Sequence, residues 1–453
     1  MTIILPGKVK LILDTLMAAG YEAYAVGGCV RDSLLSRIPN DWDITTSAKP
    51  MEVKALFKRT VDTGIKHGTV TVLMGNEGFE VTTYRIDGEY EDMRHPKEVT
   101  FTSLLSEDLR RRDFTINAMA YNDKDGLVDL FEGERDLKRG LVRAVGKPAD
   151  RFGEDALRIL RAVRFAAQLG YEIEEETAAA AGELAFNLKN ISAERINAEL
   201  VKLLTSDHPE YLIKAYELGI TEVFLPEFDR CMKTEQHNPH HCYTVGLHSI
   251  KAVCNIKRES PEDPYFRLLR IAMLLHDVAK PACLTTDEKG IDHFRGHPEV
   301  GSRMAAEILR RLKFDNRTIG FACEVVRYHD TRPELSERHI RRAINKMGLE
   351  IFQVLERVQL ADISAQSEYE REDKFKRLQD MMDIGRKILD RGDPLFLKDL
   401  ALNGNDLIKE ELAQGAEIGW MLDKLLDLVL NDPLMNDREL LLERARILRR
   451  SKR

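Results

Sequence analysis

The chain has 453 residues, too many for one ordinary hydrophobic core, so roughly two to four domains are expected. Apolar residues make up 43% of the chain, as in globular proteins, and no run of about 18 apolar residues predicts a transmembrane helix. The net charge of −8 argues weakly against a nucleic-acid partner, but basic residues cluster at 110–112, 158–164 and 446–453, so any polyanion site must be local.

The cysteines and the N-terminus bear on the cellular compartment. The six cysteines form no Cys-x-x-Cys pair, which indicates reduced thiols. The first eight residues lack the long apolar core and the cleavage site of a signal peptide. We therefore expect a cytoplasmic protein without a membrane segment.

A glycine turn stands at the start of the first motif. Gly27 and Gly28 follow the apolar run 23–26, and glycine lets backbone N–H groups come close to a triphosphate. Arg31 can add a guanidinium fork that binds phosphate. This combination predicts a nucleotide-phosphate site.

Two acids, Asp41 and Asp43, follow about ten residues further on. On a strand, residues two apart point to the same face, so both carboxylates would lie side by side. Such a pair favours Mg²⁺, which takes oxygen ligands, and two metal ions can activate a hydroxyl and neutralise a leaving phosphate. The alternative is a surface turn with solvated acids.

The run Gly-Gly-Cys-Val-Arg-Asp at 27–32, together with the Asp-x-Asp pair, resembles the polymerase-beta-like nucleotidyltransferases, in particular tRNA nucleotidyltransferases and bacterial poly(A) polymerases. The resemblance implies an α+β fold: a nucleotidyltransferase head with a small mixed sheet, followed by an all-helical neck, body and tail. It implies that Asp41 and Asp43 are catalytic and bind Mg²⁺. It also implies that Gly28 and Arg31 bind the nucleotide.

The next segments predict a β-hairpin beside the Asp-x-Asp strand. Residues 68–74 and 79–84 alternate in the manner of strands and flank the turn 75–78. Glu80 on the second arm is a candidate third carboxylate near the metal, the alternative being a solvated strand residue.

Residues 86–103 are polar and show no period, so we expect a long loop that is functional or disordered. In the resembled family, loss of a flexible loop in this region accompanies enzymes that add only CC. The full-length segment here favours retention of A addition.

A second motif, Arg-Arg-Asp-Phe-Thr-Ile-Asn, covers residues 111–117. Adjacent arginines beside an aspartate and an asparagine suit phosphate and ribose recognition, although a helix start with exposed basic residues would look the same. The first five residues, Arg-Arg-Asp-Phe-Thr, resemble the run that nucleotidyltransferases of the class containing the bacterial tRNA-finishing enzymes carry here. The resemblance implies that Arg112 and Asp113 bind the nucleotide.

From about residue 150 the pattern becomes helical, and residues 154–165 predict one amphipathic helix. Four polar residues recur on it at steps of three and form a wide stripe: Asp155, Arg158, Arg161 and Arg164. An aspartate can accept a hydrogen bond from the exocyclic amino group of C or A, and an arginine can donate to the same base edge. A structural salt-bridge ladder is the alternative. The resemblance implies that this helix selects C and A without a nucleic-acid template, and that all four residues bind the nucleotide.

Residues 191–200 match a further motif of the resembled family. It contains Glu194, Arg195 and Glu199. We expect this segment to support the helix at 154–165 rather than to touch substrate.

Eight of the twelve histidines lie between residues 237 and 329. Six residues of this region stand in the order His, His-Asp, His, His, Asp: His248, His276, Asp277, His297, His329 and Asp362. This order resembles the HD superfamily of metal-dependent phosphohydrolases. Imidazole and carboxylate ligands suit Mn²⁺, Ni²⁺, Fe²⁺ or Mg²⁺, and a metal-bound water could hydrolyse a phosphoester. Unrelated core and surface histidines are the alternative, and 237, 240 and 241 are expected in a loop. The resemblance implies the ligands His248, His276, Asp277 and Asp362, with His297 and His329 as accessory residues.

The C-terminal part predicts a long polar helix from Asp362 to Leu389 and then a helix-turn-helix near Asn403. This part resembles the C-terminal tRNA-binding region of the same enzymes, an ordinary helical hairpin being the alternative. The sequence thus predicts four domains: a catalytic head at 1–147, a helical neck with the nucleotide-selecting helix at 148–230, an HD-like domain at 231–365 and a tRNA-binding tail at 366–453.

The expected function is template-independent addition of CCA to the 3′ end of tRNA from CTP and ATP, with release of pyrophosphate. One alternative is a related specificity: CC addition, A addition or poly(A) synthesis. The other is a phosphohydrolase whose head only binds RNA. The sequence leaves the oligomeric state open.

Overall fold

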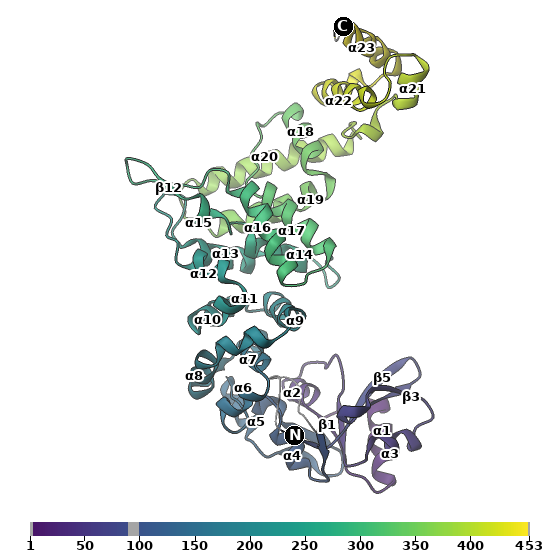
Figure 1. The fold of residues 1–453 in the computed structure, drawn as a ribbon, viewed down its shortest axis with the longest axis vertical. Helices are drawn as coiled ribbons and strands as arrows, with labels where there is room; N and C mark the ends of the chain where they lie inside the picture. The colour runs from purple at the N-terminus through teal and green to yellow at the C-terminus, as the bar shows by residue number, and fades with distance from the viewer. Residues whose placement is uncertain (1–2, 89–98, 452–453) are drawn as a thin grey trace. The chain divides into compact units, whose positions relative to one another are not determined.

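The computed structural model describes residues 3–88 and 99–451. Contacts divide the chain into two compact units, coloured from purple to teal and from teal to yellow in Figure 1. The first unit comprises Met1–Asp229 with Arg311–Lys313, and the second comprises Arg230–Arg310 with Phe314–Arg453. The finer division into four domains stays a prediction.

The first unit is built on a seven-stranded sheet in the order β3-β4-β5-β2-β1-β8-β9. Strands β2 and β5 run parallel, whereas the other neighbours run antiparallel, so the predicted mixed sheet is confirmed. The predicted hairpin is β4–β5, and it lies next to β2. The strands are β1 (Ala23–Val26), β2 (Ile44–Thr46), β3 (Thr60–Gly64), β4 (Thr69–Met74), β5 (Glu77–Thr83), β8 (Met119–Asn122) and β9 (Gly126–Asp129).

The alternation of apolar and polar side chains along β4 shows where one hydrophobic core of this unit lies. On β4, Val70 and Val72 are fully buried, while Thr69 and Thr71, which alternate with them, are partly exposed. They pack with Ile12 and Leu16, which lie four residues apart on one face of α1. The head helices are α1 (Gly7–Ala18), α2 (Gly28–Leu34), α3 (Pro50–Leu56), α4 (Leu105–Arg110) and α5 (Gly133–Arg139), with 3₁₀ turns η1 (Ile65–His67) and η2 (Thr115–Asn117).

The prediction of a long loop over residues 86–103 is wrong at both ends of that segment. Strands β6 (Arg85–Asp87) and β7 (Val99–Phe101) pair antiparallel there. The short strands show no full alternation period, which is why a periodicity reading misses them. Residues 89–98 lie outside the described part of the chain, so the expectation for that portion stays open.

Helices follow the head, as predicted. They are α6 (Pro148–Glu154), α7 (Leu157–Leu169), α8 (Glu175–Glu183), α9 (Ala193–Leu204), α10 (Tyr211–Glu217), α11 (Ile220–Phe224) and α12 (Pro226–Met232), with η3 (Ala185–Asn190) and a parallel pair of two-residue strands, β10 (Leu141–Val142) and β11 (Glu172–Ile173).

The single helix predicted over 154–165 is wrong, because the chain breaks between α6 and α7. Asp155 is extended, with φ −137° and ψ 102°, and its carboxylate accepts a hydrogen bond from the N–H of Leu157. An aspartate that bonds to the backbone two residues on competes with the helix and starts a new one. Asp155 therefore stands at the start of α7 and not within a continuous helix.

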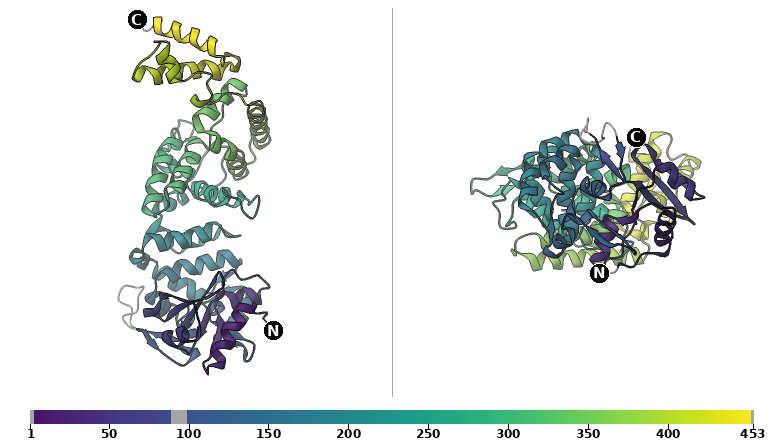
Figure 2. Two further views of the ribbon diagram at one scale, coloured as in Figure 1. Left: turned by 90° about the vertical axis from the view of Figure 1, so that its right-hand side faces the viewer. Right: turned by 90° about the horizontal axis from the view of Figure 1, so that it is seen from below.

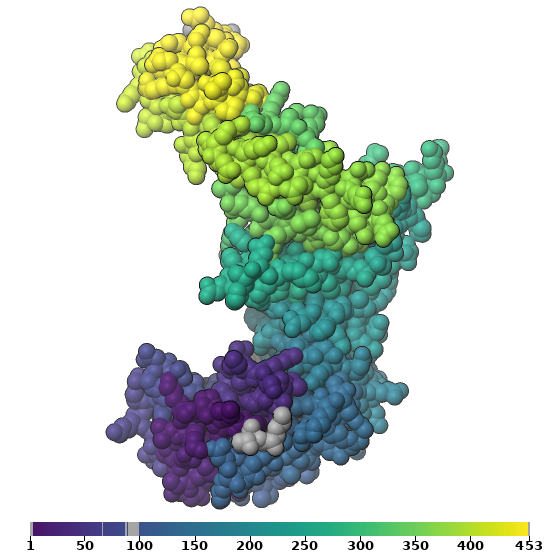
Figure 3. Space-filling view, turned by 180° about the vertical axis from the view of Figure 1, so that it is seen from behind, coloured from purple at the N-terminus to yellow at the C-terminus, as the bar shows by residue number. Residues whose placement is uncertain are grey.

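The second unit is helical, and its helix α14 is buried almost all round because the sequence Phe-Arg-Leu-Leu-Arg-Ile-Ala-Met-Leu-Leu offers little polar surface. Helices α13 and α17 pack against it, and α19 packs on both of them (Figure 1); Figure 2 gives a second view of this bundle. Helix α20 crosses the face seen in Figure 3. Among the described helices, none is long and apolar enough to span a membrane.

The elements of this unit are α13 (Val245–Asn255), α14 (Phe266–Leu275), α15 (Lys280–Cys283), α16 (His297–Arg311), α17 (Asn316–Tyr328), α18 (Glu337–Met347), α19 (Leu349–Ser364), α20 (Arg371–Asp390), η4 (Leu397–Asp399), α21 (Gly404–Lys409), α22 (Ala416–Asn431), η5 (Pro433–Met435), α23 (Arg438–Ser451) and the strand pair β12 (Thr285–Thr286) and β13 (Asp292–His293). The helix predicted from Asp362 to Leu389 is interrupted between Ser364 and Arg371. The helix-turn-helix is present as α21 and α22, and Asn403 caps α21.

Candidate active site

Asp41 and Asp43 lie immediately before β2 rather than on it. The carbonyl of Asp43 accepts a hydrogen bond from the N–H of Val26 at 2.9 Å, which continues the pairing of β1 with β2. In the parallel pair β2–β5, Ile44 is opposite Val81, so Asp43 and Glu80 come one residue earlier on the two neighbouring segments. Three carboxylates therefore meet at this end of the sheet.

The negative charges of these three carboxylates repel one another, so the group favours a bound cation. The pKa of Asp43 is raised to about 6, first because surrounding protein removes hydration and then because Asp41 and Glu80 are negative, while Arg112 acts in the opposite direction. Asp41, Asp43 and Glu80 remain open to solvent on one side. An all-oxygen donor set with excess negative charge fits a hard divalent cation.

The glycine turn lies beside these acids. Gly27 has φ 83°, a conformation that favours glycine, and it precedes the first residue of α2, Gly28. A Cβ at Gly27 would stand 3.0 Å from Nη1 of Arg112, so the glycine lets the guanidinium approach the backbone. The glycine turn, Arg112 and the acidic residues therefore lie close together.

Asp108 is a buried residue that the sequence reading did not select. It accepts hydrogen bonds from Arg111 Nη2 at 2.7 Å, from Arg112 Nη2 at 3.4 Å and from Thr45 Oγ1 at 3.0 Å. It therefore ties the arginine pair to β2. Its position three and four residues before the two arginines was the signal available in the sequence.

A hydrogen-bonded chain connects Arg31 with Arg161. Arg31 Nη1 donates to Asn117 Oδ1 at 2.6 Å, Asn117 Nδ2 donates to Asp113 Oδ1 at 3.1 Å, and Arg161 Nε donates to Asp113 Oδ2 at 2.8 Å. Burial raises the pKa of Asp113, but the charge of Arg161, the hydrogen bonds from Asn117 and Arg161 and the charge of Arg158 together outweigh burial and lower that pKa. The predicted residues on α2, in the second motif and on α7 are thus brought together.

The aromatic ring of Phe165 adds a second connection between α2 and α7. The guanidinium carbons of Arg31, Arg161 and Arg164 lie 5.1, 5.3 and 3.5 Å from its centroid. Arg164 also donates to Glu199 Oε2 at 2.8 Å. Burial of its guanidinium lowers the pKa of Arg164 to about 10, although Glu199 acts in the opposite direction. Phe165 was not selected from the sequence, where it resembles any core aromatic.

Asp155 and Arg158 have separate partners. Arg195 Nη2 on α9 donates to Asp155 Oδ2 at 2.7 Å. Arg158 donates to Glu154 Oε2 at 2.8 Å and to the carbonyl of Arg111 at 2.9 Å. The 191–200 segment thus contacts this region through Arg195, as predicted for a supporting element.

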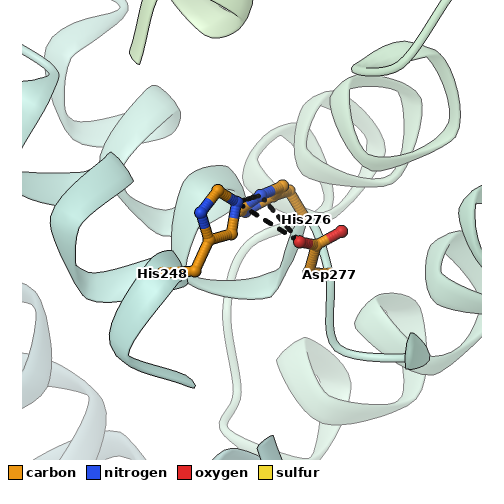
Figure 4. A group of neighbouring side chains, drawn as sticks. All are labelled: His248, His276 and Asp277. Carbon is orange, nitrogen blue, oxygen red and sulfur yellow. Dashed lines mark hydrogen bonds and ion pairs between the residues drawn. The ribbon is translucent and has the colours of Figure 1, made fainter. Parts of the chain in front are cut away.

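A buried cluster lies in the second unit. His248 comes from α13, His276 and Asp277 follow α14, and Asp362 comes from α19. Figure 4 shows the two imidazoles converging with Asp277. His248 Nε2 is 3.2 Å from His276 Nε2 and 2.9 Å from Asp362 Oδ1, and Asp277 Oδ2 is 3.4 and 3.3 Å from the two nitrogens. Burial would lower the pKa of His276, but Asp277 and Asp362 raise it to about 10.

The accessory histidines lie on the other side of Asp277. Nε2 of His297 and of His329 are 3.3 and 3.6 Å from Asp277 Oδ1. Among the described residues, two groups have the spacing of metal ligands, and they share only Asp277: one contains His248 and His276, the other His297 and His329.

A cavity of about 630 Å³ opens above this cluster. Its wall includes Lys280, whose Nζ is 2.8 Å from Asp277 Oδ2, and His241, whose pKa burial and Lys280 lower to about 2. Neither residue was selected from the sequence, although Lys280 follows Asp277 by three positions. Further basic residues of the wall are Arg295, Arg332 and Lys374.

Comparisons with known proteins agree with the geometry of the first unit. Residues 23–143 match a family model described as the poly A polymerase head domain. Residues 170–232 match one for a probable RNA and SrmB-binding site of polymerase A, and residues 285–445 match tRNA nucleotidyltransferase domain 2, putative. The chain is therefore a nucleotidyltransferase.

Individual relatives show which kind of nucleotidyltransferase the chain is similar to. The CCA-adding enzyme of Lactobacillus helveticus is 35% identical over 95% of this chain and 94% of its own length. That of Lactiplantibacillus plantarum is 54% identical, but the alignment spans 44% of this chain and only 49% of that relative. The crystal structure of the Bacillus stearothermophilus CCA-adding enzyme in complex with CTP superposes with a TM-score of 0.74 at 28% identity, covering 99% of this chain and 100% of that one. The chain belongs to the family of CCA-adding enzymes, and membership implies use of a divalent metal.

Proposed function

We propose that the chain adds C, C and A in turn to the 3′ end of tRNA, using CTP and ATP. The observation that carries the proposal is the group formed by Asp41 and Asp43, just before β2, and Glu80, on β5, close to the Gly27 turn and Arg112, in a chain of this family. In each cycle the terminal 3′-oxygen forms a bond to the α-phosphorus, the bond to the β-phosphate oxygen breaks, and pyrophosphate leaves. The hydroxyl proton passes to solvent.

The metal of the head is proposed to be Mg²⁺, held by Asp41 and Asp43. When bound, such ions lower the pKa of the attacking hydroxyl and neutralise the leaving phosphate. The chain's own residues supply the rest: Gly28 leaves space for the phosphates at the start of α2, and Arg31 and Arg112 offer guanidinium donors. Asp113, Arg161 and Arg164 are proposed to hold the nucleotide through the network around Phe165.

Base choice is proposed to reside at Asp155 and Arg158. The Asp155 carboxylate can accept from the exocyclic amino group that C and A share, and Arg158 can donate to the neighbouring ring position. U and G carry carbonyl oxygens where the amino group is needed. The four-domain division, with a tRNA-binding tail at 366–453, and a cytoplasmic location belong to the same proposal.

The test uses purified protein with tRNA transcripts that lack CCA, end in CC or are complete, each with one labelled nucleoside triphosphate. The expected result is C incorporation on the first transcript, A incorporation on the second and none on the third. Absence of C incorporation would contradict the proposal, and failure on the CC transcript alone would indicate a CC-adding enzyme. Unlimited A addition would indicate a poly(A) polymerase.

A second candidate function rests on the cluster in the second unit. We propose that His248, His276, Asp277 and Asp362 bind a divalent cation, such as Mn²⁺, Ni²⁺, Fe²⁺ or Mg²⁺, and that the site hydrolyses phosphoesters. It is supported by the convergence of four donors from three helices at 2.9–3.7 Å spacing beneath a cavity with basic walls. Hydrolysis joins water oxygen to phosphorus, and the released alcohol takes up a proton.

Phosphatase activity with added Mn²⁺ or Ni²⁺ tests this second function. Asp277→Ala is expected to abolish the activity, whereas His339→Gln on α18 should retain it because His339 is outside the cavity wall and its Nδ1 lies 2.8 Å from Ser336 Oγ. Equal rates for the wild type and Asp277→Ala would rule the function out.

A further inference from the structure

We propose that Asp108 is a positioning residue for nucleotidyl transfer: its carboxylate holds the guanidinium of Arg112 beside the Gly27 turn and away from the acids Asp41 and Asp43. This role rests on the nucleotidyl transfer proposed above and deepens it. In that mechanism Asp108 itself touches neither metal nor nucleotide, so it acts through Arg112.

The carboxylate of Asp108 is a fixed anchor. Asp108 lies on α4 and is completely buried, and its Oδ1 accepts hydrogen bonds from Nε and Nη2 of Arg111 at 3.0 and 2.7 Å. Burial raises the pKa of Asp108, but the charges of Arg111 and Arg112 and the hydrogen bonds from Arg111 and Thr45 outweigh burial and lower that pKa. The group therefore stays ionised, and Arg111 occupies its first oxygen.

The second oxygen of Asp108 connects Arg112 with the segment that carries the acids. Oδ2 accepts from Thr45 Oγ1 at 3.0 Å and from Arg112 Nη2 at 3.4 Å. Thr45 follows Asp43 by two positions, and Asp43 continues the pairing of β1 with β2, so the two residues face the same side of the sheet. Asp108 thereby fixes the place of the guanidinium relative to the proposed metal ligands.

The guanidinium of Arg112 keeps donors that the protein does not use. Within residues 3–88 and 99–451, its hydrogen-bond and ion-pair partner is Asp108 alone, and its Nε is buried without a partner. Its Nη1 lies against the glycine turn, where a Cβ at Gly27 would stand 3.0 Å away. A buried N–H without an acceptor is unfavourable until a ligand or water supplies one. These donors therefore suit the phosphate oxygens of a nucleotide at the start of α2.

Asp108 also prevents a competing ion pair. Arg112 stabilises the charged form of Asp43 from a distance, but no ion pair joins the two residues in the described part of the chain. A guanidinium released from Asp108 would be drawn to the three acids of the metal site and would pair with Asp43. It would then occupy an oxygen that the cation needs. With Asp108 in place, cation and guanidinium bind to different carboxylates.

The test replaces the anchor without changing its size. Asp108→Asn should lower the affinity for CTP about tenfold, as when a charged group loses its hydrogen-bond partner; calorimetry in EDTA measures this without any transfer. In the incorporation assay, the half-saturating Mg²⁺ concentration should rise about fivefold because Arg112 competes for Asp43. The matched control Glu107→Gln, on the same helix, should change neither value. Wild-type values in Asp108→Asn would overturn the inference.

A double variant separates positioning from general stabilisation. If Asp108 acts through Arg112, removing the guanidinium removes the competitor, so Asp108→Asn combined with Arg112→Ala should need no more Mg²⁺ than Arg112→Ala alone. The CTP affinities of these two proteins should also be equal. A raised Mg²⁺ requirement that persists in the double variant would assign Asp108 a structural role and overturn the inference.

A milder substitution gives an answer if Asp108→Asn fails to fold. Thr45→Val removes one hydrogen bond to Oδ2 at nearly constant volume, and it should raise the Mg²⁺ requirement in the same direction by a smaller factor. No change would overturn the inference. Failure of the wild type to incorporate C would contradict the proposed function instead. The CTP affinities of wild type and variants, measured without turnover, would then still decide on Asp108, and equal affinities would overturn its role.

Discussion

The two clusters of proposed metal ligands differ in how they compensate charge. In the head, Asp41, Asp43 and Glu80 are open to solvent and stand together with Arg112 as a nearby cation. In the second unit, Asp277 and Asp362 are buried among imidazoles whose Nδ1 atoms are fixed by the backbone. The head suits metals that arrive with a nucleotide and leave with pyrophosphate. The buried cluster suits a resident metal.

The largest expected effect tests the independence of the two sites. Asp43→Ala removes a proposed ligand, and loss of several kcal/mol of transition-state stabilisation lowers CMP incorporation by about 1000-fold or more. Metal-dependent phosphatase activity should be unchanged. Asp14→Ala, which removes an exposed acid of α1, is the control. Retention of incorporation by Asp43→Ala would remove the basis for the head mechanism.

The next effect concerns base selection. Asp155→Ala should reduce discrimination of CTP against UTP by about 5–160-fold, which corresponds to about 1–3 kcal/mol of base-edge hydrogen bonding. The ratio of kcat/KM for the two nucleotides measures it. Asp150→Ala on α6, an exposed acid close in sequence, should leave the ratio unchanged. A uniform loss with both nucleotides would assign Asp155 a structural role.

A pH titration tests the solvent-exposed carboxylates of the head, which differ from the buried carboxylates of the second unit. Asp43 must be ionised to bind a cation, and its pKa of about 6 means that cation affinity is lost as the pH falls through that value. At limiting Mg²⁺, incorporation should drop about tenfold for each pH unit below the midpoint. Raising Mg²⁺ should move the midpoint to lower pH, because the ion competes with the proton. A midpoint independent of Mg²⁺ would show that another group controls the profile.

The smallest effect tests Arg195 as a positioning residue. Arg195→Ala removes the ion pair at 2.7 Å that holds Asp155, and a loss of about 1 kcal/mol lowers CTP discrimination about fivefold. Arg195→Lys should recover part of it, and Glu194→Ala is the control on the same turn of α9. If the melting temperature falls while the discrimination ratio stays constant, Arg195 stabilises the fold and does not position Asp155.

Local sequence patterns predicted those elements whose structure is determined by residues close together in the sequence. The threonine–valine alternation of β4 and the Asp-x-Asp pair before β2 were readable because period and spacing lie within a few residues. The break at Asp155 was missed because one side-chain bond to Leu157 outweighs an otherwise continuous helical pattern. Strands β6 and β7 were missed because each is short and defined by the other.

Long-range contacts account for the remaining omissions. Asp108 contributes to the head site by its hydrogen bond with Thr45, which is 63 positions away in the sequence. Lys280 is held in the cavity wall by Gln236 and His241, which lie on a separate loop. Neither relation is encoded in a local period. The histidines were found as a set from their order in the chain, but their division into two pairs around Asp277 depends on packing of helices from separate stretches.

Phe165 affects how mutational data on this protein should be interpreted. Its ring touches no phosphate in the proposed mechanism, yet three guanidinium groups rest around it. Replacing the ring with a small side chain would alter Arg31, Arg161 and Arg164 at once, so one substitution would imitate a triple mutant. A scan that ranks positions by lost activity would place Phe165 among the substrate contacts. Comparison with Phe165→Tyr, which keeps the ring, separates a shared support from a contact.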